Sequence, residues 1–383
     1  FDMTDDELRE IGASGWTIYD EGHSQNLQVP AATDYYDGPW GPTRSAVAYA
    51  DSPLAMFFYS LPKELWIRIA DETNRYRNQN IHAIAVSRRA KMLTKQQADP
   101  RMSVPSLADL EERLHKFMRI QAREILHVIA LRFARAIAPI RDGLAKHWSI
   151  DEDGAIPRGT FGSFMTRDRF EAIMQFLHFN DNEDGGARAD KAWKVRPLLQ
   201  TIEKTFRRGY RLGRVISFDE GMMPNRSKFN PMRIFMPDKP SKYGTLINQP
   251  VKRLVVTDSF FKRMPQGTYR IAQARDHPEL IALSWMESKP VNMVATGCST
   301  QLASVLRTEK DGTRSAIPCP QLVVDYAIGM GGVDVHDQLR LQRYSIQKCI
   351  LLRKYYKQLI LCIVDMAVVN GYIVYCVTLK KRE

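Results

Sequence analysis

The spacing of apolar residues changes twice along this chain, and that change most constrains its fold. From Leu61 to Phe206, apolar residues recur three and four positions apart, which predicts amphipathic helices. Residues 214–296 instead contain short β-branched runs bounded by turn residues, which predicts strands. Helical spacing returns from Ser345 to Tyr375. This order predicts an α+β or α/β fold, with a central sheet domain flanked by helices.

Local sequence signals predict the bounds of the individual helices and strands. Pro62 fits the first turn of a helix over residues 61–80. Ser106 and Asp109 resemble a capping box, so we expect a second helix from Ser106 to Pro139. Further helices are predicted over residues 165–182 and 197–206, and strands over 214–220, 253–261 and 290–296, whereas residues 317–324 fit neither pattern clearly.

The net charge of +12 favours a polyanionic partner, although a surplus of solvated surface charge would give the same total. The 44% apolar content indicates a globular chain. The five cysteines form no CxxC pair, so we expect reduced thiols and no zinc site. Residues 359–376 are long enough to span a membrane, but they include Asp365 and Asn370. We therefore expect a buried core helix there and no membrane partner.

The segment MGGVDVHDQLRLQRYS, residues 330–345, places two acids directly after two glycines. Asp334 and Asp337 could cap a helix, or they could belong to a metal site. Two more acids, Asp219 and Asp258, end β-branched runs. Carboxylates at strand ends can converge at a sheet edge and share Mg²⁺, although each alone also fits a turn or a helix cap.

Several motifs occur in one order and resemble the piggyBac family of transposases. They are FDEGMMP (218–224), FMPDKPSKYGT (235–245), VVTDSFF (255–261) and DYAIGMGGVDVHDQ (325–338). Residues 52–76, 165–181 and 353–374 resemble the same family, so the likeness runs from about Ser52 to Tyr375. The resemblance implies an RNase H-like catalytic core, with a complete or incomplete sheet, flanked by N-terminal and C-terminal helices.

The same resemblance implies a three-aspartate site. Asp219, Asp258 and Asp334 match the family's acids by motif, and Asp337 matches an accessory acid beside the third. In that family the acids bind two Mg²⁺ or Mn²⁺ ions and cut DNA at transposon ends, with insertion at TTAA. The glycines before Asp334 would allow a tight bend. The implied partners are double-stranded DNA and a second copy of the chain as a homodimer, and the implied location is the nucleus.

The sequence departs from the family in its intervals. Asp258 follows Asp219 by 39 residues and Asp334 follows Asp258 by 76, both shorter than in the family. Many family members carry a cysteine-rich C-terminal domain, and we expect none here because the five cysteines form no CxxC pair. Two functions follow from this: a DDD-type transposase, or a catalytically inactive relic that binds DNA or acts as a scaffold.

Basic residues gather near the three acids. They could contact DNA phosphates, or they could be ordinary solvated faces. The candidates are Arg207, Arg208, Arg211, Lys239, Lys242, Lys252, Arg253, Lys262, Arg263, Arg353, Lys354 and Lys357.

The patterns predict four regions. They are an N-terminal arm over residues 1–50, a helical dimerisation or DNA-binding region over 51–210, a catalytic core with a reduced insertion over 211–345, and a C-terminal helical region over 346–383.

Overall fold

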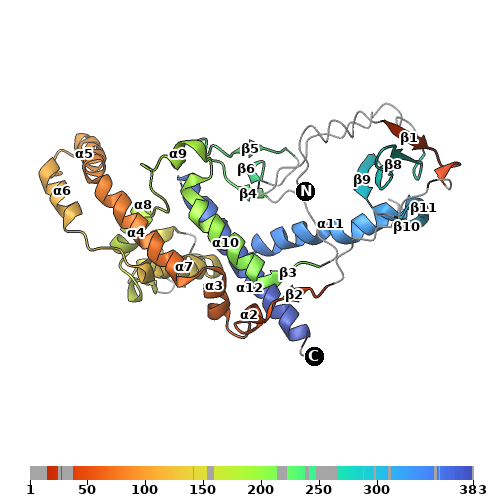
Figure 1. Ribbon diagram of the computed structural model, residues 1–383. Helices are drawn as coiled ribbons and strands as arrows, with labels where there is room; N and C mark the ends of the chain where they lie inside the picture. Colours follow the sequence, from red (N-terminus) through yellow and green to blue (C-terminus); the bar gives the residue numbers. More distant parts are fainter. Residues whose placement is uncertain are drawn as a thin grey trace. The chain divides into compact units, whose positions relative to one another are not determined.

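The computed structural model divides into two compact units, each described here by itself (Figure 1). The helical unit contains residues 40–211, 222–246 and 336–381, and the sheet unit contains residues 15–39, 212–213 and 265–335, both with gaps. The described residues are 15–24, 27, 38–140, 142–152, 159–213, 222–237, 241–246, 265–287, 289–296, 299–308, 312–348, 352 and 354–381.

The helical unit is built from helices whose apolar residues pack into one core. Its main helices are α3 (Pro53–Ser60), α4 (Lys63–Gln79), α5 (Ile81–Ala98), α6 (Leu107–His115), α7 (Ala122–Ile137), α8 (Arg167–Phe176), α10 (Arg196–Gly209) and α12 (Tyr355–Lys380). Short helical turns connect them: α2 (Arg44–Val47), η2 (Leu144–Trp148), η3 (Phe161–Ser163), α9 (Gly186–Ala189) and η4 (Trp193–Val195).

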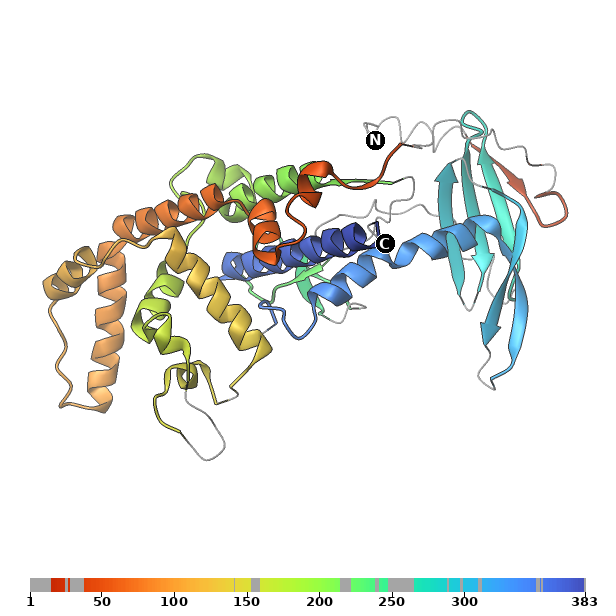
Figure 2. The same cartoon turned by 90° about the horizontal axis from the view of Figure 1, so that it is seen from below.

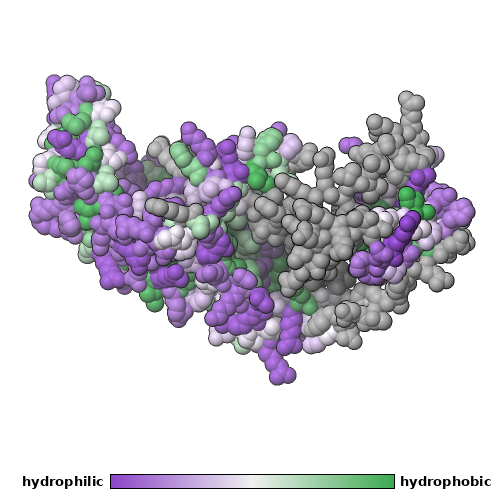
Figure 3. Space-filling model, turned by 45° about the horizontal axis from the view of Figure 1, so that its top comes forward, coloured by the Kyte–Doolittle hydropathy of each residue, from purple (hydrophilic) through white to green (hydrophobic). Residues whose placement is uncertain are grey.

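Two small antiparallel sheets complete this unit. Strand β2 (Gly41–Pro42) pairs with β3 (Tyr210–Arg211), and β6 (Tyr243–Leu246) lies between β4 (Met222–Pro224) and β5 (Ile234–Phe235). Hydrophilic side chains cover much of the helical unit's surface in Figure 3, and green patches appear at the end that α5 and α6 form. Among the exposed apolar residues of α5 are Val86 and Leu93.

The helices predicted over residues 61–80 and 197–206 are confirmed as α4 and α10, and α8 covers residues 167–176 of the predicted 165–182. The Ser106–Asp109 capping box begins α6, and α7 ends at Ile137, before Pro139. The predicted single helix from Ser106 to Pro139 is wrong, however, because α6 stops at His115 and α7 begins only at Ala122.

The side chain of Asn74 explains this break. Its amide nitrogen donates to the Ile120 carbonyl at 2.8 Å, and its oxygen accepts from the Ile120 amide at 2.9 Å. Both backbone groups of Ile120 thus bond to α4, so neither needs a helical partner. Gln121 and Glu124 then form a second capping box that begins α7.

Helix α12 lies largely in the core of the helical unit. Leu359 to Val364 are all buried, and Asp365 is fully buried. By length and composition α12 could cross a membrane, but 56% of its apolar window is buried inside the protein, which favours the prediction of a core helix. The helix begins at Tyr355 and not at the predicted Ser345.

The sheet unit contains a four-stranded antiparallel sheet of order β1-β7-β8-β9 (Figure 2). Ile271 of the central strand β7 pairs with Leu283 of β8, and Leu283 pairs with Met293 of β9. The strands are β1 (Trp16–Tyr19), β7 (Tyr269–Ala274), β8 (Leu280–Met286) and β9 (Pro290–Thr296), followed by the hairpin of β10 (Leu302–Thr308) and β11 (Arg314–Pro320).

The core of the sheet unit includes residues from the start of α11 (Gln321–Arg340). Val323 of this helix contacts the apolar cluster that contains Ile271, Ile281 and Leu283. The predicted strand over 290–296 is confirmed as β9, whereas those over 214–220 and 253–261 lie outside the described residues.

The mixed composition of helices and strands confirms an α+β architecture, and every described strand pair is antiparallel. The region boundaries differ from those predicted. Residues 222–246 belong to the helical unit, and β1 of the predicted N-terminal arm pairs with β7. Both differences arise because segments that are distant in the sequence contact each other in the fold.

Candidate functional site

Helix α11 carries the two described acids of the predicted site. It continues without a break from Gln321 to Arg340. Gly331 and Gly332 lie inside it, and neither has a positive φ. The predicted bend before Asp334 is therefore wrong: the flanking residues continue the helix, and glycine weakens a helix interior only by roughly 1 kcal/mol. Both Asp334 and Asp337 lie in the helix interior, so neither caps a helix.

Asp334 presents a carboxylate that is available for a ligand. Its side chain is exposed and bonds to no other residue within the described ranges. A free carboxylate oxygen is the kind of donor that Mg²⁺ prefers. The other two predicted acids, Asp219 and Asp258, lie outside the described residues, and the described part of the chain brings no three metal-binding side chains together.

Asp337 is held in an ion pair, in contrast to Asp334. Its Oδ1 accepts from Nη2 of Arg340 at 2.9 Å and from Nε at 3.3 Å. The Arg340 side chain is 0% exposed and that of Asp337 is 26% exposed. The pair is three residues apart on one helix, where side chains meet. Asp337 is therefore a partner of a buried guanidinium and is not free in the way that Asp334 is.

Arg340 donates to three further groups, which with Asp337 form what we call the Arg340 network. Nη2 donates to the Met222 carbonyl of β4, and Nη1 donates to Oε1 of Gln347 and to Sγ of Cys362 in α12, each at 2.9 Å. Burial raises the pKa of the Cys362 thiol to about 12, although the Arg340 charge acts in the opposite direction. The network joins β4, α11 and α12 inside the helical unit.

The Arg340 network fixes the strand that directly follows the first predicted acid. Met222 comes three residues after Asp219 in the chain. Gln347 adds a second bond to β4, because its Nε2 donates to the Pro224 carbonyl at 3.2 Å. The sequence analysis did not identify Arg340. The available signal was its place three residues after Asp337, the spacing of a helical ion pair.

Asp365 organises the segment between α11 and α12. Its carboxylate accepts from the Ser345 hydroxyl at 2.8 Å and from the amides of Ile346 and Gln347 at 3.2 Å each. Burial raises the pKa of Asp365 to about 6, although these hydrogen bonds act in the opposite direction. The segment stays outside α12 because a side chain, and not the helix, satisfies these amides.

His336 bonds to α12. Its Nε2 lies 3.1 Å from Oδ1 of Asn370. Burial lowers the pKa of His336. This histidine therefore contacts an amide inside the helical unit, as a polar side chain of the fold.

The basic residues predicted to contact DNA differ in how far their side chains are buried. Lys242, Arg207, Arg208 and Arg211 are exposed. Arg208 lies over the ring of Tyr59 at 4.6 Å from its centroid. Lys354 is half-buried at the start of α12. The remaining candidates, Lys239, Lys252, Arg253, Lys262, Arg263 and Arg353, lie outside the described residues.

The prediction that Lys357 contacts DNA is wrong, because this side chain is buried and cannot form part of a surface that contacts DNA. Its amine donates to the carbonyls of Met174 and Gln175 at the end of α8. The carbonyls in the last turn of a helix lack helical partners and attract a cation. Burial, with the charges of Lys354 and Arg132, lowers the pKa of Lys357 to about 7. The sequence showed only a lysine near the start of a helix.

The chain is similar to known transposases. A family model described as Transposase IS4 matches residues 52–249 and 248–372. The two matched segments meet within the short interval between Asp219 and Asp258. A solved structure, the cryo-EM structure of a piggyBac transposase synaptic complex with hairpin DNA, is similar at a TM-score of 0.58 and 18% identity. The similarity covers 90% of this chain and 79% of that one.

Proposed function

We propose a function for this chain from its family, because it belongs to the transposases described as Transposase IS4 and is of the piggyBac type. The proposal is that it binds double-stranded DNA and cuts strands at TTAA next to transposon ends. It would act as a homodimer in the nucleus, through an RNase H-like core. The observation that carries it is the extent of the family match, which includes Asp219 in its first segment and Asp258 and Asp334 in its second.

Different residues would have different roles in metal binding and in DNA contact. Asp219, Asp258 and Asp334 would hold Mg²⁺ or Mn²⁺, and the free carboxylate of Asp334 fits this role. Bound ions would activate the attacking oxygen and stabilise the leaving one. Exposed Arg207, Arg208, Arg211 and Lys242 would contact phosphates, which positions DNA without reading its sequence.

A cleavage assay tests this proposal. The protein is incubated with Mg²⁺ or Mn²⁺ and a labelled duplex that carries TTAA beside transposon-end sequence. Nicking is expected, and Asp219→Ala, Asp258→Ala and Asp334→Ala should each abolish it. Asp325→Ala is the matched control, because Asp325 is also an exposed acid on α11. Equal loss of nicking in Asp325→Ala and Asp334→Ala would contradict a specific role for Asp334.

The alternative is a DNA-binding relic without catalysis. The short interval of 39 residues between Asp219 and Asp258 favours it, since a displacement of about 1 Å can cost roughly 10²-fold in rate. Tight DNA binding by the wild type, with no nicking in either metal, would establish this alternative.

A further inference from the structure

Two lysine side chains, Lys194 and Lys354, both lie over the ring of Tyr356 at the start of α12, with Nζ of Lys354 5.9 Å from the ring centroid. Nζ of Lys354 donates to the Tyr76 hydroxyl at 3.1 Å and lies 4.7 Å from the Tyr76 ring centroid. Nζ of Lys194 lies 5.1 Å from the ring centroid of Tyr356 and donates to Oδ1 of Asn182 at 2.8 Å. We call Lys194, Lys354, Tyr76 and Tyr356 the lysine–tyrosine cluster, which combines η4, α4 and α12 of the helical unit.

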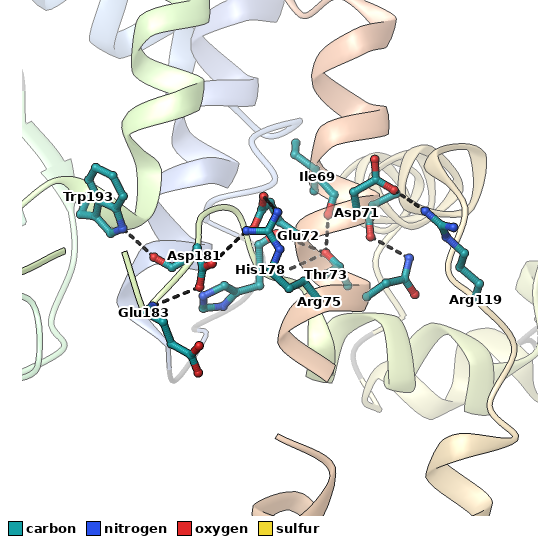
Figure 4. Close-up of polar contacts among 12 residues, drawn as sticks. Ile69, Asp71, Glu72, Thr73, Arg75, Arg119, His178, Asp181, Glu183 and Trp193 are labelled. Carbon is teal, nitrogen blue, oxygen red and sulfur yellow. Dashed lines mark hydrogen bonds and ion pairs between the residues drawn. The ribbon is translucent and has the colours of Figure 1, made fainter. Parts of the chain in front are cut away.

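The cluster has positive charge without an opposing carboxylate. Neither Lys194 nor Lys354 forms an ion pair with a described residue. Burial, and then the charge of Lys354, lowers the pKa of Lys194. The acid nearest to Lys194 in sequence, Asp190, is occupied elsewhere, because its carboxylate accepts from Nε and Nη2 of Arg196 at 2.6 Å each. The carboxylate of Asp181 accepts from Nη1 of Arg75 at 3.0 Å (Figure 4).

His178, between the two tyrosines, does not add a charge to the cluster. Its ring is stacked on Tyr76 with centroids 4.3 Å apart, and its Nδ1 lies 3.3 Å from the Tyr356 hydroxyl. Burial lowers the pKa of His178 to about 4, and the charges of Lys194 and Lys354 contribute to this lowering. The imidazole is thus neutral at pH 7, and the half-buried ammonium groups of Lys194 and Lys354 supply charge to the cluster.

The backbone around the cluster is well held. The His178 amide donates to the Thr73 hydroxyl at 3.2 Å, and the Trp193 indole donates to the Asp181 carbonyl at 2.7 Å (Figure 4). These bonds fasten the loop before Lys194 to α4. Both lysines are half-buried, so each keeps part of its surface for a ligand. A half-buried pair of like charges favours an anion that neutralises both.

We infer that Lys194 and Lys354 bind a backbone phosphate of DNA over the rings of Tyr76 and Tyr356. Each ammonium has three donors and uses one in the contacts described here, so both can donate to phosphate oxygens. The inference rests on the proposed DNA binding and adds Lys194, which the sequence analysis did not single out. Such a contact carries no sequence preference.

The test measures DNA affinity against salt. Fluorescence anisotropy with a labelled duplex is followed from 50 to 200 mM NaCl for the wild type and for the double variant Lys194→Gln/Lys354→Gln. Each phosphate contact contributes about −0.9 to the slope of log affinity against log salt. We expect the double variant to have a slope shallower by about 1 and a roughly three- to tenfold lower affinity at 50 mM.

Control variants and a folding measurement separate the loss of charge from a loss of structure. Lys194→Arg/Lys354→Arg keeps both charges and should retain the slope. Lys91→Gln removes an exposed lysine of α5 and should leave the slope unchanged if the loss is specific. Circular dichroism melting checks that the double variant is folded, and Lys354→Gln alone provides a milder variant with the same expected direction.

The outcomes distinguish the inference from the proposed function. DNA binding by the wild type with an unchanged slope in a folded glutamine variant would overturn the inference alone. Stabilisation of the wild type by inorganic phosphate, lost in that variant while the DNA slopes stay equal, would assign the cluster to free phosphate and also overturn it. No DNA binding by the wild type would overturn both.

Discussion

At the scale of single residues, Arg340 makes the most consequential buried contacts of the helical unit. Arg340→Met would leave the Met222 carbonyl, the Gln347 side chain and Asp337 without their donor. Breaking a buried charge pair in this way costs roughly 3–5 kcal/mol. Urea unfolding should show that loss, and Arg343→Met, an exposed neighbour, should change stability by less than about 0.5 kcal/mol. Equal effects of the two substitutions would contradict a structural role for the Arg340 network.

Lys357 should make stability depend on pH. Its folded pKa is about 7, and an unfolded lysine has a pKa of about 10.4. Between these values the unfolded chain binds a proton that the folded chain does not, so the free energy of unfolding rises with pH, by at most roughly 1.4 kcal/mol per unit.

The measurement is urea unfolding of wild type and Lys357→Met from pH 6 to 10. The stability of the wild type relative to the variant should be constant below about pH 7 and rise above it. The difference between the proteins removes the opposite contributions of Tyr356 and Cys362, whose pKa values burial raises. A flat difference across this range would show that Lys357 titrates normally. Lys91→Met is the exposed control.

At the scale of elements, Asp365 of α12 holds the segment of residues 345–347 by three hydrogen bonds. Asp365→Ala would leave the buried amides of Ile346 and Gln347 without acceptors, each at a cost of about 1–3 kcal/mol. Hydrogen exchange at these two amides should accelerate, whereas Asp365→Asn, which keeps one carbonyl oxygen, should accelerate it less. Unchanged exchange in Asp365→Ala would mean that other groups hold the segment.

Elements with local signals were predictable from the sequence, and those set by distant partners were not. The Ser106 capping box and the apolar stripe around Phe170 correctly gave α6 and α8. The break after α6 depends on Asn74, the path of residues 345–347 on Asp365, and the burial of Lys357 on the carbonyls of α8. None of these partners is a sequence neighbour. Asp334 is exposed on α11, and its role as a metal ligand stays a prediction, whereas the helical path through Gly331 was not predicted.

At the scale of the whole molecule, the two units have separate apolar cores. The cluster around Ile271 and Leu283 contains only residues of the sheet unit, and the cluster around Trp66 and Phe170 only residues of the helical unit. Calorimetry should therefore show two unfolding transitions. Leu283→Ala, at a cost of roughly 2–5 kcal/mol, should lower one of them, and Arg340→Met should lower the other. A single transition that both substitutions shift would contradict this independence.

The bond between Asn74 and Ile120 has an implication for how this protein tolerates change. One side-chain amide bonds to both backbone polar groups of a single residue, Ile120, so the corner between α6 and α7 is fixed by a position along the chain. Met118, in that corner, is 75% exposed, and Arg169 bonds only to its carbonyl. Natural variation should therefore change the side chain at position 118 freely, while the number of residues between α6 and α7 stays the same.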